Sequence, residues 1–245
     1  MTAPVPEMGV IGLLGGMSWP STVTYYRELN RAVAARLGVP HSARVLLWSE
    51  DYAELERMQL AGEWEAAGRR VVAGALRLEA GGADLLGIAC NTMHRVADSV
   101  RERCGLPLVD LVEAAAAEAA ARRMTNVAVL GTRFTARMTA YPAELGRRGV
   151  ATAAITERAQ QDLDRIIYEE LCRGSVTPRA GERLHEIIGE LAASGADGVL
   201  LACTELNLLV DDGPQAEIGL IDTVRTHVGA LVDASFATRP GTSPC

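Results

Sequence analysis

The chain has 245 residues, of which 49% are hydrophobic, 4% aromatic and 22% charged, and its formal net charge is −7. This length allows one large domain or two lobes of ordinary size, each with a real core. The acidic balance argues against nucleic-acid and membrane-surface binding, because both favour a basic face. Since no 18-residue apolar run and no charged-then-apolar leader is present, we expect a cytoplasmic protein without a membrane span.

Two features of the composition restrict the chemistry. All 24 basic residues are arginine, so the chain has no lysine for a pyridoxal phosphate Schiff base or a Walker P-loop. The cysteines are odd in number, contain no Cys-x-x-Cys pair and predict no disulfide framework. With only four histidines, a structural zinc site has little support. The sequence therefore predicts neither a cofactor nor a metal. The five cysteines are Cys90, Cys104, Cys172, Cys203 and Cys245.

The first half of the chain predicts alternating strands and helices. A buried strand at 10–14 leads through the glycine turn Gly15-Gly16-Met17-Ser18 into a helix, for which Pro20 suits the first turn. The turn does not match Gly-x-Gly-x-x-Gly, so it favours close backbone approach to a ligand over a dinucleotide site. Further strands are expected at 43–48, 82–90 and 108–109, and helices at 20–37, 49–59, 63–78, 92–103 and 110–124.

The second half predicts the same alternation. Strands are expected at 127–132, 150–155 and 195–203, and helices at 134–147 (broken or bent near Pro142), 160–172 and 178–193. A last helix is expected to end at about 236, before a frayed tail at 238–245. Strands that alternate with helices of ten or more residues indicate a parallel sheet covered on both faces.

One sequence motif, called the Gly-Ala-Asp phrase below, occurs twice in the chain. Gly82-Ala83-Asp84 and Gly195-Ala196-Asp197 each precede an apolar run that ends in Ala-Cys, at Cys90 and Cys203, and two further matches lie at similar offsets. We therefore expect an α/β fold of two similar Rossmann-like lobes, each a mostly parallel sheet flanked by helices. The lobes would be related by a pseudo-twofold internal duplication, with the active site in the cleft. The N-terminal lobe would comprise residues 1–112 plus 225–245 and the C-terminal lobe residues 113–224.

The paired cysteines predict acid/base chemistry. Both would lie at the carboxyl end of a parallel strand, where α/β sheets place their ligands. A following helix N-terminus would lower the pKa of each thiol and bind a carboxylate, with side-chain donors from Asn91, Thr92 and Thr204. One thiolate would remove the α-proton of a bound amino acid and the other thiol would protonate the opposite face, without a cofactor.

Other interpretations remain open. A buried cysteine is usually a small hydrophobe, which is the preferred interpretation of Cys104 and Cys172, and no role is expected for Cys245. Cys90 and His94 would make a hydrolase dyad, but that leaves Cys203 unexplained. Glu205 would either take a proton from Cys203 or cap the following helix.

At these residues the chain resembles the aspartate/glutamate racemase family of PLP-independent amino-acid racemases. The resemblance extends to about residue 230 and is carried by the segments 12–18, 90–94 and 203–205. The motifs at 15–19, 59–64 and 91–94 are most similar to the broad-specificity amino-acid racemase branch. The resemblance implies Cys90 and Cys203 as catalytic residues. The substrate-binding residues that we expect are Met17, Gln59, Asn91, Thr92, Thr132, Thr204 and Glu205. We also expect a homodimer with a small-molecule amino-acid substrate.

One departure from the family pattern concerns specificity. Aspartate-specific members hold the substrate side chain with an arginine and a lysine, whereas here residues 166–170 carry acids and residues 48–52 contain no arginine. We therefore expect broad or non-acidic specificity, although Arg133 is a cation that lies outside these two segments. The alternatives are an aspartate/glutamate-specific racemase, a decarboxylase or cis–trans isomerase of small dicarboxylates, and a two-lobed sensor without chemistry.

Overall fold

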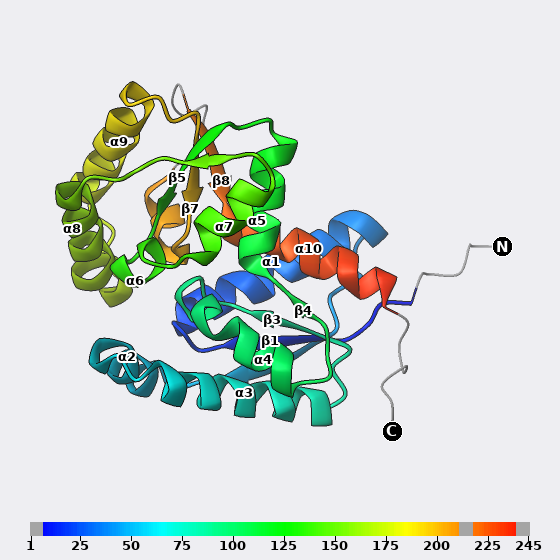
Figure 1. Cartoon of the computed structure of the whole chain (residues 1–245). Helices are drawn as coiled ribbons and strands as arrows, with labels where there is room; N and C mark the ends of the chain where they lie inside the picture. The colour runs from blue at the N-terminus through cyan, green and yellow to red at the C-terminus, as the bar shows by residue number, and fades with distance from the viewer. Residues whose placement is uncertain (1–6, 211–217, 239–245) are drawn as a thin grey trace. The chain divides into compact units, whose positions relative to one another are not determined.

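The chain divides into two compact units, shown with their helices and strands in Figure 1. The computed structural model describes residues 7–210 and 218–238. Unit 1 contains the described residues up to Leu111 and from His227 onward, and unit 2 contains Val112–Thr226. Of the tail expected at 238–245, all but Thr238 lies outside the described residues, as does Cys245.

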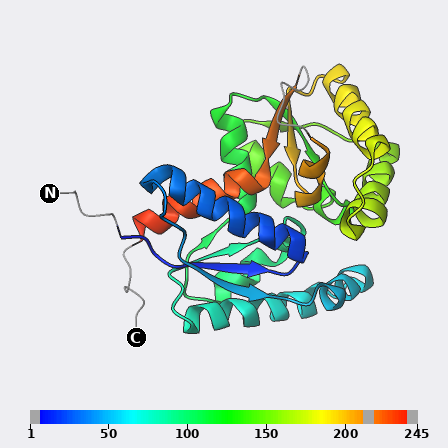
Figure 2. The same ribbon diagram turned by 180° about the vertical axis from the view of Figure 1, so that it is seen from behind.

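Unit 1 is a four-stranded parallel sheet of order β2-β1-β3-β4 with helices on both sides. Helix α1 lies over one side of the sheet and α3 over the other, as Figure 2 shows. The strands are β1 (Ile11–Gly15), β2 (Val45–Ser49), β3 (Leu85–Ile88) and β4 (Leu108–Val109). The helices are α1 (Trp19–Leu37), α2 (Tyr52–Ala61), α3 (Trp64–Ala80), the 3-10 helix η1 (Thr92–Val96), α4 (Ala97–Arg103) and most of α10 (Thr223–Ala237).

Unit 2 repeats this plan with the parallel order β6-β5-β7-β8. Its strands are β5 (Asn126–Leu130), β6 (Ala151–Thr152), β7 (Gly198–Leu201) and β8 (Gly219–Asp222). The helices are α5 (Leu111–Ala121), α6 (Arg133–Ala136), α7 (Ala140–Arg147), α8 (Glu157–Arg165), the π-helix η2 (Ile166–Glu170), the 3-10 helices η3 (Leu171–Arg173) and η4 (Thr204–Leu209), and α9 (Pro178–Ala193). Two parallel sheets with one strand order confirm the predicted α/β fold of two similar lobes.

The repeated Gly-Ala-Asp phrase has a structural cause. Gly82 and Gly195 both have positive φ, +89° and +92°, which glycine adopts without strain. The aspartate of each phrase ties the sheet together: Asp84 accepts a hydrogen bond from the Val10 N–H at 2.7 Å, and Asp197 accepts one from the Asn126 N–H at 3.0 Å. The phrase therefore joins the third strand of each unit to the start of its first strand.

Several predicted elements differ from the structure. The helix expected at 92–103 begins as η1, and the strand expected at 150–155 is only the two-residue β6. The helix expected at 134–147 is two helices, and the break lies between α6 and α7, before Pro142. Pro142 is in the first turn of α7, where its missing N–H leaves no helical hydrogen bond unmade. The helix expected at 160–172 starts earlier, at Glu157, and changes to π and 3-10 geometry.

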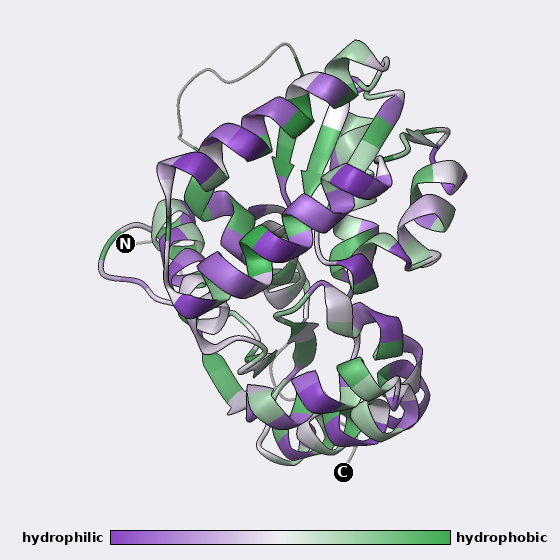
Figure 3. Ribbon diagram, turned by 90° about the vertical axis from the view of Figure 1, so that its left-hand side faces the viewer, coloured by the Kyte–Doolittle hydropathy of each residue, from purple (hydrophilic) through white to green (hydrophobic). Residues whose placement is uncertain are grey.

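Each unit has its own hydrophobic core. One core cluster in unit 1 gathers Leu14, Met17, Met93 and residues of α3 beside the sheet, and one in unit 2 gathers β5, β7 and the inner faces of α8 and α9. Figure 3 shows the strands of unit 2 in hydrophobic colours and the helices in mixed colours, as expected for helices with one buried face. None of the helices in the described part of the chain is both long enough and apolar enough to span a bilayer.

Alanine substitutions at two glycines test the packing of the turn after β1: Gly16 lies in that turn, and Gly189 is a control elsewhere in the chain. A Cβ at Gly16 would lie 2.2 Å from the Glu50 carbonyl oxygen, and Gly16 has φ +82°. We predict that Gly16→Ala lowers the free energy of unfolding by more than about 2 kcal/mol. A Cβ at Gly189, inside α9, would meet no atom within 4 Å, so Gly189→Ala should raise stability by about 0.5–1 kcal/mol. Urea titrations measure both; equal stability of Gly16→Ala and the unmodified protein would contradict the packing.

Candidate active site

The two repeat cysteines occupy equivalent positions in their units. Cys90 follows the last residue of β3 by two positions, and Cys203 follows the last residue of β7 by two positions. The alanine before each cysteine donates a backbone hydrogen bond to the neighbouring strand: Ala89 N–H to the Leu14 carbonyl at 2.8 Å, and Ala202 N–H to the Leu130 carbonyl at 2.7 Å. The chain order reverses between these neighbouring strands, and parallel α/β sheets bind ligands at such points, beyond the carboxyl ends of the strands.

The expected residues of unit 1 gather around Cys90. Met17 and Met93 share a core cluster against which half-buried Cys90 packs. Gln59 of α2 is buried and donates from Nε2 to the Met93 sulfur at 3.2 Å. Asn91 and Thr92, both buried, begin η1 directly after Cys90. The structure therefore brings these side chains together from three segments.

His94 is held by the backbone on both ring nitrogens. The Leu111 N–H can only donate, so the His94 Nε2 at 3.1 Å must accept. The Nδ1–H therefore donates to the Cys90 carbonyl at 2.9 Å. Burial lowers the pKa of His94, which keeps the ring neutral. This arrangement argues against the Cys90–His94 hydrolase dyad, because neither ring nitrogen remains to receive the thiol proton.

A second buried histidine extends this network. His227 Nε2–H donates to the Val109 carbonyl at 2.9 Å, and its Nδ1 lies 2.9 Å from the Tyr25 hydroxyl, which therefore donates to it. The rings of His94 and His227 lie edge to face with centroids 5.8 Å apart. Burial, followed by the charge of His94, lowers the pKa of His227 to about 3. The two histidines thus hold the ends of β3 and β4 through backbone carbonyls.

In unit 2 the side chain of Glu205 is bonded to its two preceding residues. The Cys203 Sγ–H donates to Glu205 Oε2 at 3.2 Å, and the Thr204 hydroxyl donates to the same oxygen at 2.7 Å. Cys203 is buried and part of the unit 2 core. Glu205 is therefore in hydrogen-bond contact with the thiol.

The expected lowering of the thiol pKa is wrong for Cys203. Burial, followed by the negative charge of Glu205, raises the pKa of Cys203 well above its ordinary value. The helix that follows is the six-residue 3-10 helix η4, and Cys203 is its N-cap without a side-chain capping bond. Desolvation of the thiolate outweighs whatever so short a helix contributes. Cys203 therefore rests as a neutral thiol.

Thr132 lies in a polar group that sequence reasoning only partly identified. It caps α6 by accepting from the Thr135 N–H, and it hydrogen-bonds to Tyr168 of the π-helix η2. Burial raises the pKa of Tyr168, whose environment also includes the charges of Asp164, Arg133 and Cys203. The phenol stays protonated at neutral pH. π-Helical turns occur often at functional sites, and Tyr168 places one beside Thr132.

Arg133 is the cation of this group. Its guanidinium lies 5.6 Å from the centroid of the Tyr168 ring and 3.7 Å from Asp164 Oδ2, and its backbone N–H donates to Asp164 Oδ1 at 2.8 Å. Arg133 is therefore paired with the carboxylate of Asp164, while the carboxylate of Glu205 lies on the Cys203 side chain.

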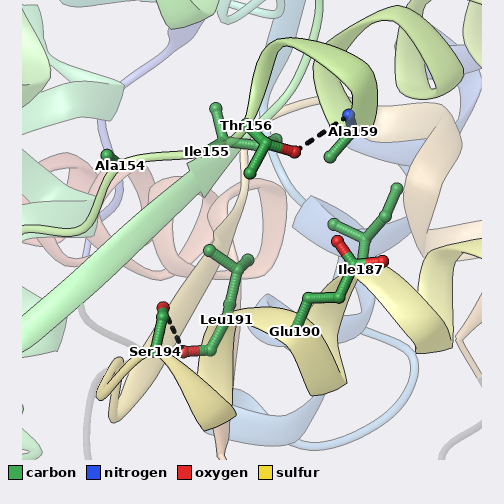
Figure 4. Close-up of a pocket in the computed structure, with 8 residues that line it drawn as sticks. All are labelled: Ala154, Ile155, Thr156, Ala159, Ile187, Glu190, Leu191 and Ser194. Carbon is green, nitrogen blue, oxygen red and sulfur yellow. Dashed lines mark hydrogen bonds between the residues drawn. The ribbon is translucent and has the colours of Figure 1, made fainter.

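A separate pocket in unit 2 contains none of the expected site residues. It has a volume of about 80 Å³ and lies between the start of α8 and the end of α9, as Figure 4 shows. Its polar groups are used inside the protein: Glu190 binds Arg183, and Ser194 donates to the Leu191 carbonyl. Within the described ranges, no group of three or more His, Cys, Asp or Glu side chains is arranged to hold a metal ion. The pocket is lined by Ala154, Ile155, Thr156, Ala159, Ile187, Glu190, Leu191 and Ser194.

Sequence reasoning missed Tyr168, Asp164 and His227. Tyr168 and Asp164 lie more than thirty residues after Thr132 on an element expected to be an ordinary helix, and His227 is on the last helix of the chain. Tertiary packing alone brings Tyr168 and Asp164 to Thr132 and Arg133, and His227 to His94. The available sequence signal was the set of polar residues within 160–170. The buried side of a regular amphipathic helix needs only apolar residues, so polar residues there would have indicated a site.

This fold, with a cysteine at the same position in both units, belongs to a known family. The profile of the Asp/Glu/hydantoin racemases matches residues 14–231, and the chain is a member of that family. Among curated relatives, a glutamate racemase of Desulforudis audaxviator (strain MP104C) is 29% identical over 162 residues, covering 64% of this chain and 54% of the relative. The broad specificity amino-acid racemase RacX of Bacillus subtilis (strain 168) is 27% identical over 157 residues, covering 63% of this chain and 66% of the relative. The matches thus span between about half and two thirds of these curated relatives.

Solved structures of racemase relatives match a larger part of the chain than the curated sequences do. A Yersinia pestis protein described as a candidate Asp/Glu racemase superposes with a TM-score of 0.85 at 36% identity, covering 93% of this chain and 99% of the other. PH1733, an aspartate racemase homologue from Pyrococcus horikoshii OT3, gives 0.81 at 28% identity with the same coverage. These similarities place the whole two-unit fold within the racemase family.

The buried histidines predict acid-sensitive stability. The pKa of His227 is about 3 in the folded protein and about 6.5 when unfolded. Between these values only the unfolded chain binds the proton, so stability falls as the pH is lowered through this window. We predict a loss of roughly 2 kcal/mol from His227 alone between pH 6.5 and pH 5.

Thermal melts in matched buffers at pH 7 and pH 5 measure this effect. His227→Gln should show a smaller pH-dependent shift of Tm than the unmodified protein, whereas His185→Gln, at an exposed position on α9, should leave the shift unchanged. An equal shift in the His227→Gln variant would show that His227 does not carry the effect.

Proposed function

We propose that this protein is a cofactor-independent amino-acid racemase in which Cys90 and Cys203 are the acid/base pair. The observation that carries the proposal is the equivalent placement of the two cysteines. Each follows an alanine hydrogen-bonded to the neighbouring strand, at 2.8 Å in unit 1 and 2.7 Å in unit 2. A packing role alone would not require the same thiol at the same turn of both units.

The reaction follows from these two thiols. The thiolate of one cysteine removes the α-proton, which forms an S–H bond and leaves the electron pair on the α-carbon and its carboxylate. The thiol of the other cysteine donates its proton to the opposite face, which forms the new C–H bond and leaves a thiolate. We propose that the substrate carboxylate is held by hydroxyl and amide donors, because these stabilise the negative charge that develops on it. The proposed donors are Asn91, Thr92, Thr132 and Thr204.

Glu205 gives Cys203 a route between its two protonation states. Because the pKa of Cys203 is raised, this cysteine rests as a thiol and is ready to act as the acid. To act as the base it must first lose its proton, and Glu205 Oε2 at 3.2 Å is the acceptor in contact with it. We propose that Glu205 takes this proton when the enantiomer facing Cys203 is the substrate.

The absence of lysine from the sequence supports a reaction without pyridoxal phosphate. We propose that the protein acts without a cofactor in the cytoplasm, as a homodimer. None of the four cysteines in the described ranges forms a disulfide, which fits a reducing compartment.

Two other functions are separated by one assay. A decarboxylase or cis–trans isomerase needs only one of the two cysteines, and a sensor needs neither. Single enantiomers of the proteinogenic amino acids, and small dicarboxylates beside them, are incubated with the protein and the products separated by chiral chromatography. Formation of the opposite enantiomer supports the racemase. Loss of CO₂ from a dicarboxylate, or conversion of its cis into its trans double bond, supports the second class, and unchanged substrates throughout support the sensor.

The charges of the site favour non-acidic substrates. Arg133, the cation beside Thr132, already faces Asp164, and Glu205 adds a further carboxylate. A second substrate carboxylate would therefore enter a region that holds more acids than bases. We propose broad specificity for neutral, polar and basic amino acids. The name of the RacX relative states broad specificity for that protein.

The acid/base roles predict separable half-reactions. Cys90→Ser and Cys203→Ser should each lower racemisation by roughly 10²–10⁴-fold, because each removes one acid/base group. In D₂O each variant should still exchange the α-proton of one enantiomer, and the two variants should act on opposite enantiomers. Mass spectrometry with chiral separation measures this. Cys104→Ser is the control, since Cys104 is as buried as Cys203 but lies outside the site. Racemisation at the unmodified rate by both single variants would contradict the assignment.

Substrate choice is a separate prediction. Burying a carboxylate without a partner costs several kcal/mol, so kcat/KM for aspartate should be roughly a hundredfold or more below that for the best neutral or basic amino acid. Steady-state kinetics on a substrate panel test this. If aspartate instead gave the highest kcat/KM and lost it in Arg133→Gln, Arg133 would be a carboxylate-binding residue and the prediction would be wrong.

A further inference from the structure

The residue four positions after each cysteine has an equivalent place in the two units. His94 follows Cys90 by four positions and lies in η1, and Asn207 follows Cys203 by four positions and lies in η4. Neither residue belongs to the acid/base pair or to the proposed substrate donors. Both side chains are instead hydrogen-bonded to residues at the end of the fourth strand of their own unit, where the next helix begins.

In unit 1, His94 connects the cysteine turn to the start of α5. Its Nδ1–H donates to the Cys90 carbonyl at 2.9 Å, and its Nε2 accepts from the Leu111 N–H at 3.1 Å. Leu111 is the first residue of α5, so this N–H is one of those that the helix itself leaves without a partner. His94 is only 5% exposed, so water does not compete for either bond. One rigid ring therefore sets the distance between the Cys90 carbonyl and the helix.

In unit 2, Asn207 makes a similar connection through a carboxylate. Its side chain is hydrogen-bonded to Asp222, the last residue of β8. Asp222 Oδ1 in turn accepts from the Val224 N–H at 2.8 Å, in the first turn of α10. The helix that carries Asn207 is thereby tied to the helix that follows the fourth strand.

The strand register shows that these two connections end at nearly equivalent positions. The residue paired with the position three before the cysteine is Val109 in unit 1 and Ile221 in unit 2. His94 binds the backbone N–H two positions after Val109, and Asn207 binds the side chain one position after Ile221. An imidazole and an amide thus make the same kind of connection at the same place, which indicates a shared role.

Each cysteine turn is therefore held from two sides. On one side, the N–H of the alanine before the cysteine donates to the first strand of the sheet, at 2.8 Å in unit 1 and 2.7 Å in unit 2. On the other side, His94 or Asn207 ties the turn to the helix after the fourth strand. Such support matters for a proton-transferring group, because a misplacement of about 1 Å can slow a reaction roughly a hundredfold.

We propose that His94 and Asn207 are positioning residues, each of which fixes the place of the thiol four positions before it. This inference rests on the proposed function, in which Cys90 and Cys203 transfer the protons. Neither positioning residue exchanges a proton with the substrate. Both ring nitrogens of His94 are occupied by backbone groups, and the amide of Asn207 does not titrate.

Residual proton exchange separates positioning from a general structural role. In D₂O, Cys203→Ser leaves only Cys90 to exchange the α-proton of one enantiomer, and Cys90→Ser leaves only Cys203. Adding His94→Leu should lower the exchange of Cys203→Ser by roughly ten- to a hundredfold and leave that of Cys90→Ser unchanged. Adding Asn207→Leu should give the opposite pattern. Equal losses in both backgrounds would show that the substitutions disturb the fold as a whole, and would overturn the proposal.

Alkylation with iodoacetamide tests the connection in unit 1 without any substrate. His94→Leu should speed the alkylation of half-buried Cys90 by about tenfold at fixed pH, because the loss of two hydrogen bonds lets the turn open more often. Peptide mass spectrometry measures the rate at each cysteine. His94→Gln should give an intermediate rate, since its amide oxygen can take the place of Nε2 and still accept from Leu111.

His185 provides the matched control. Its Nδ1 makes the same four-residue bond, to the Gly181 carbonyl at 2.8 Å, but it is exposed on α9 and far in sequence from either cysteine turn. His185→Leu should change neither the proton exchange nor the alkylation of Cys90.

Equal alkylation of Cys90 in the unmodified protein and in His94→Leu would overturn the proposal. An unmodified protein that exchanges the α-proton of no amino acid would overturn the racemase proposal instead. The alkylation rates would then still decide whether His94 holds the Cys90 turn, so the two failures are distinguishable.

Discussion

The pairing of the first and third strands in each unit is the interaction on which the candidate site depends. β1 with β3 and β5 with β7 are parallel neighbours that end together, and one backbone hydrogen bond beyond each pair fixes the alanine that precedes the cysteine. Because parallel strands end at one edge, the glycine turn after β1 and the cysteine after β3 necessarily meet there. In unit 2 a Cβ at Gly131 would lie 2.7 Å from the Ala202 carbonyl oxygen, so the residues that follow them, Thr132 and Cys203, lie at the same edge of the sheet.

Burial sets the protonation states at this edge. It raises the pKa of Cys203 and lowers the pKa values of His94 and His227, so all three groups are neutral at pH 7. Both histidines are already hydrogen-bonded, His94 to two backbone groups and His227 to one backbone group and the Tyr25 hydroxyl, so the proposed reaction uses the thiols. In that proposal Glu205, which is hydrogen-bonded to the Cys203 thiol, is the proton acceptor that the buried cysteine needs to become a base.

Much of the fold was predictable because its signals are local. Apolar runs, glycine turns and the repeated Gly-Ala-Asp phrase indicated the strands and the duplication, and Pro178 marked the first residue of α9. The pKa of Cys203 was not predictable, since it depends on the unit 2 core, which forms only in the folded chain and buries the thiol. Tyr168 was missed for the same reason: only the π-helix η2 and its packing bring it to Thr132. Local patterns thus indicated where Cys90 and Cys203 lie, whereas their chemical environment required the folded chain.

Solvent labelling of the unmodified protein tests the two-cysteine account most directly. The enzyme is incubated in D₂O with one pure enantiomer of an amino acid that it converts, and both enantiomers are separated and analysed by mass spectrometry early in the reaction. Two bases on opposite faces predict deuterium in nearly every product molecule and almost none in the remaining substrate. Comparable deuterium in the recovered substrate, or product that retains the original proton, would indicate a single base and would contradict the roles assigned to Cys90 and Cys203.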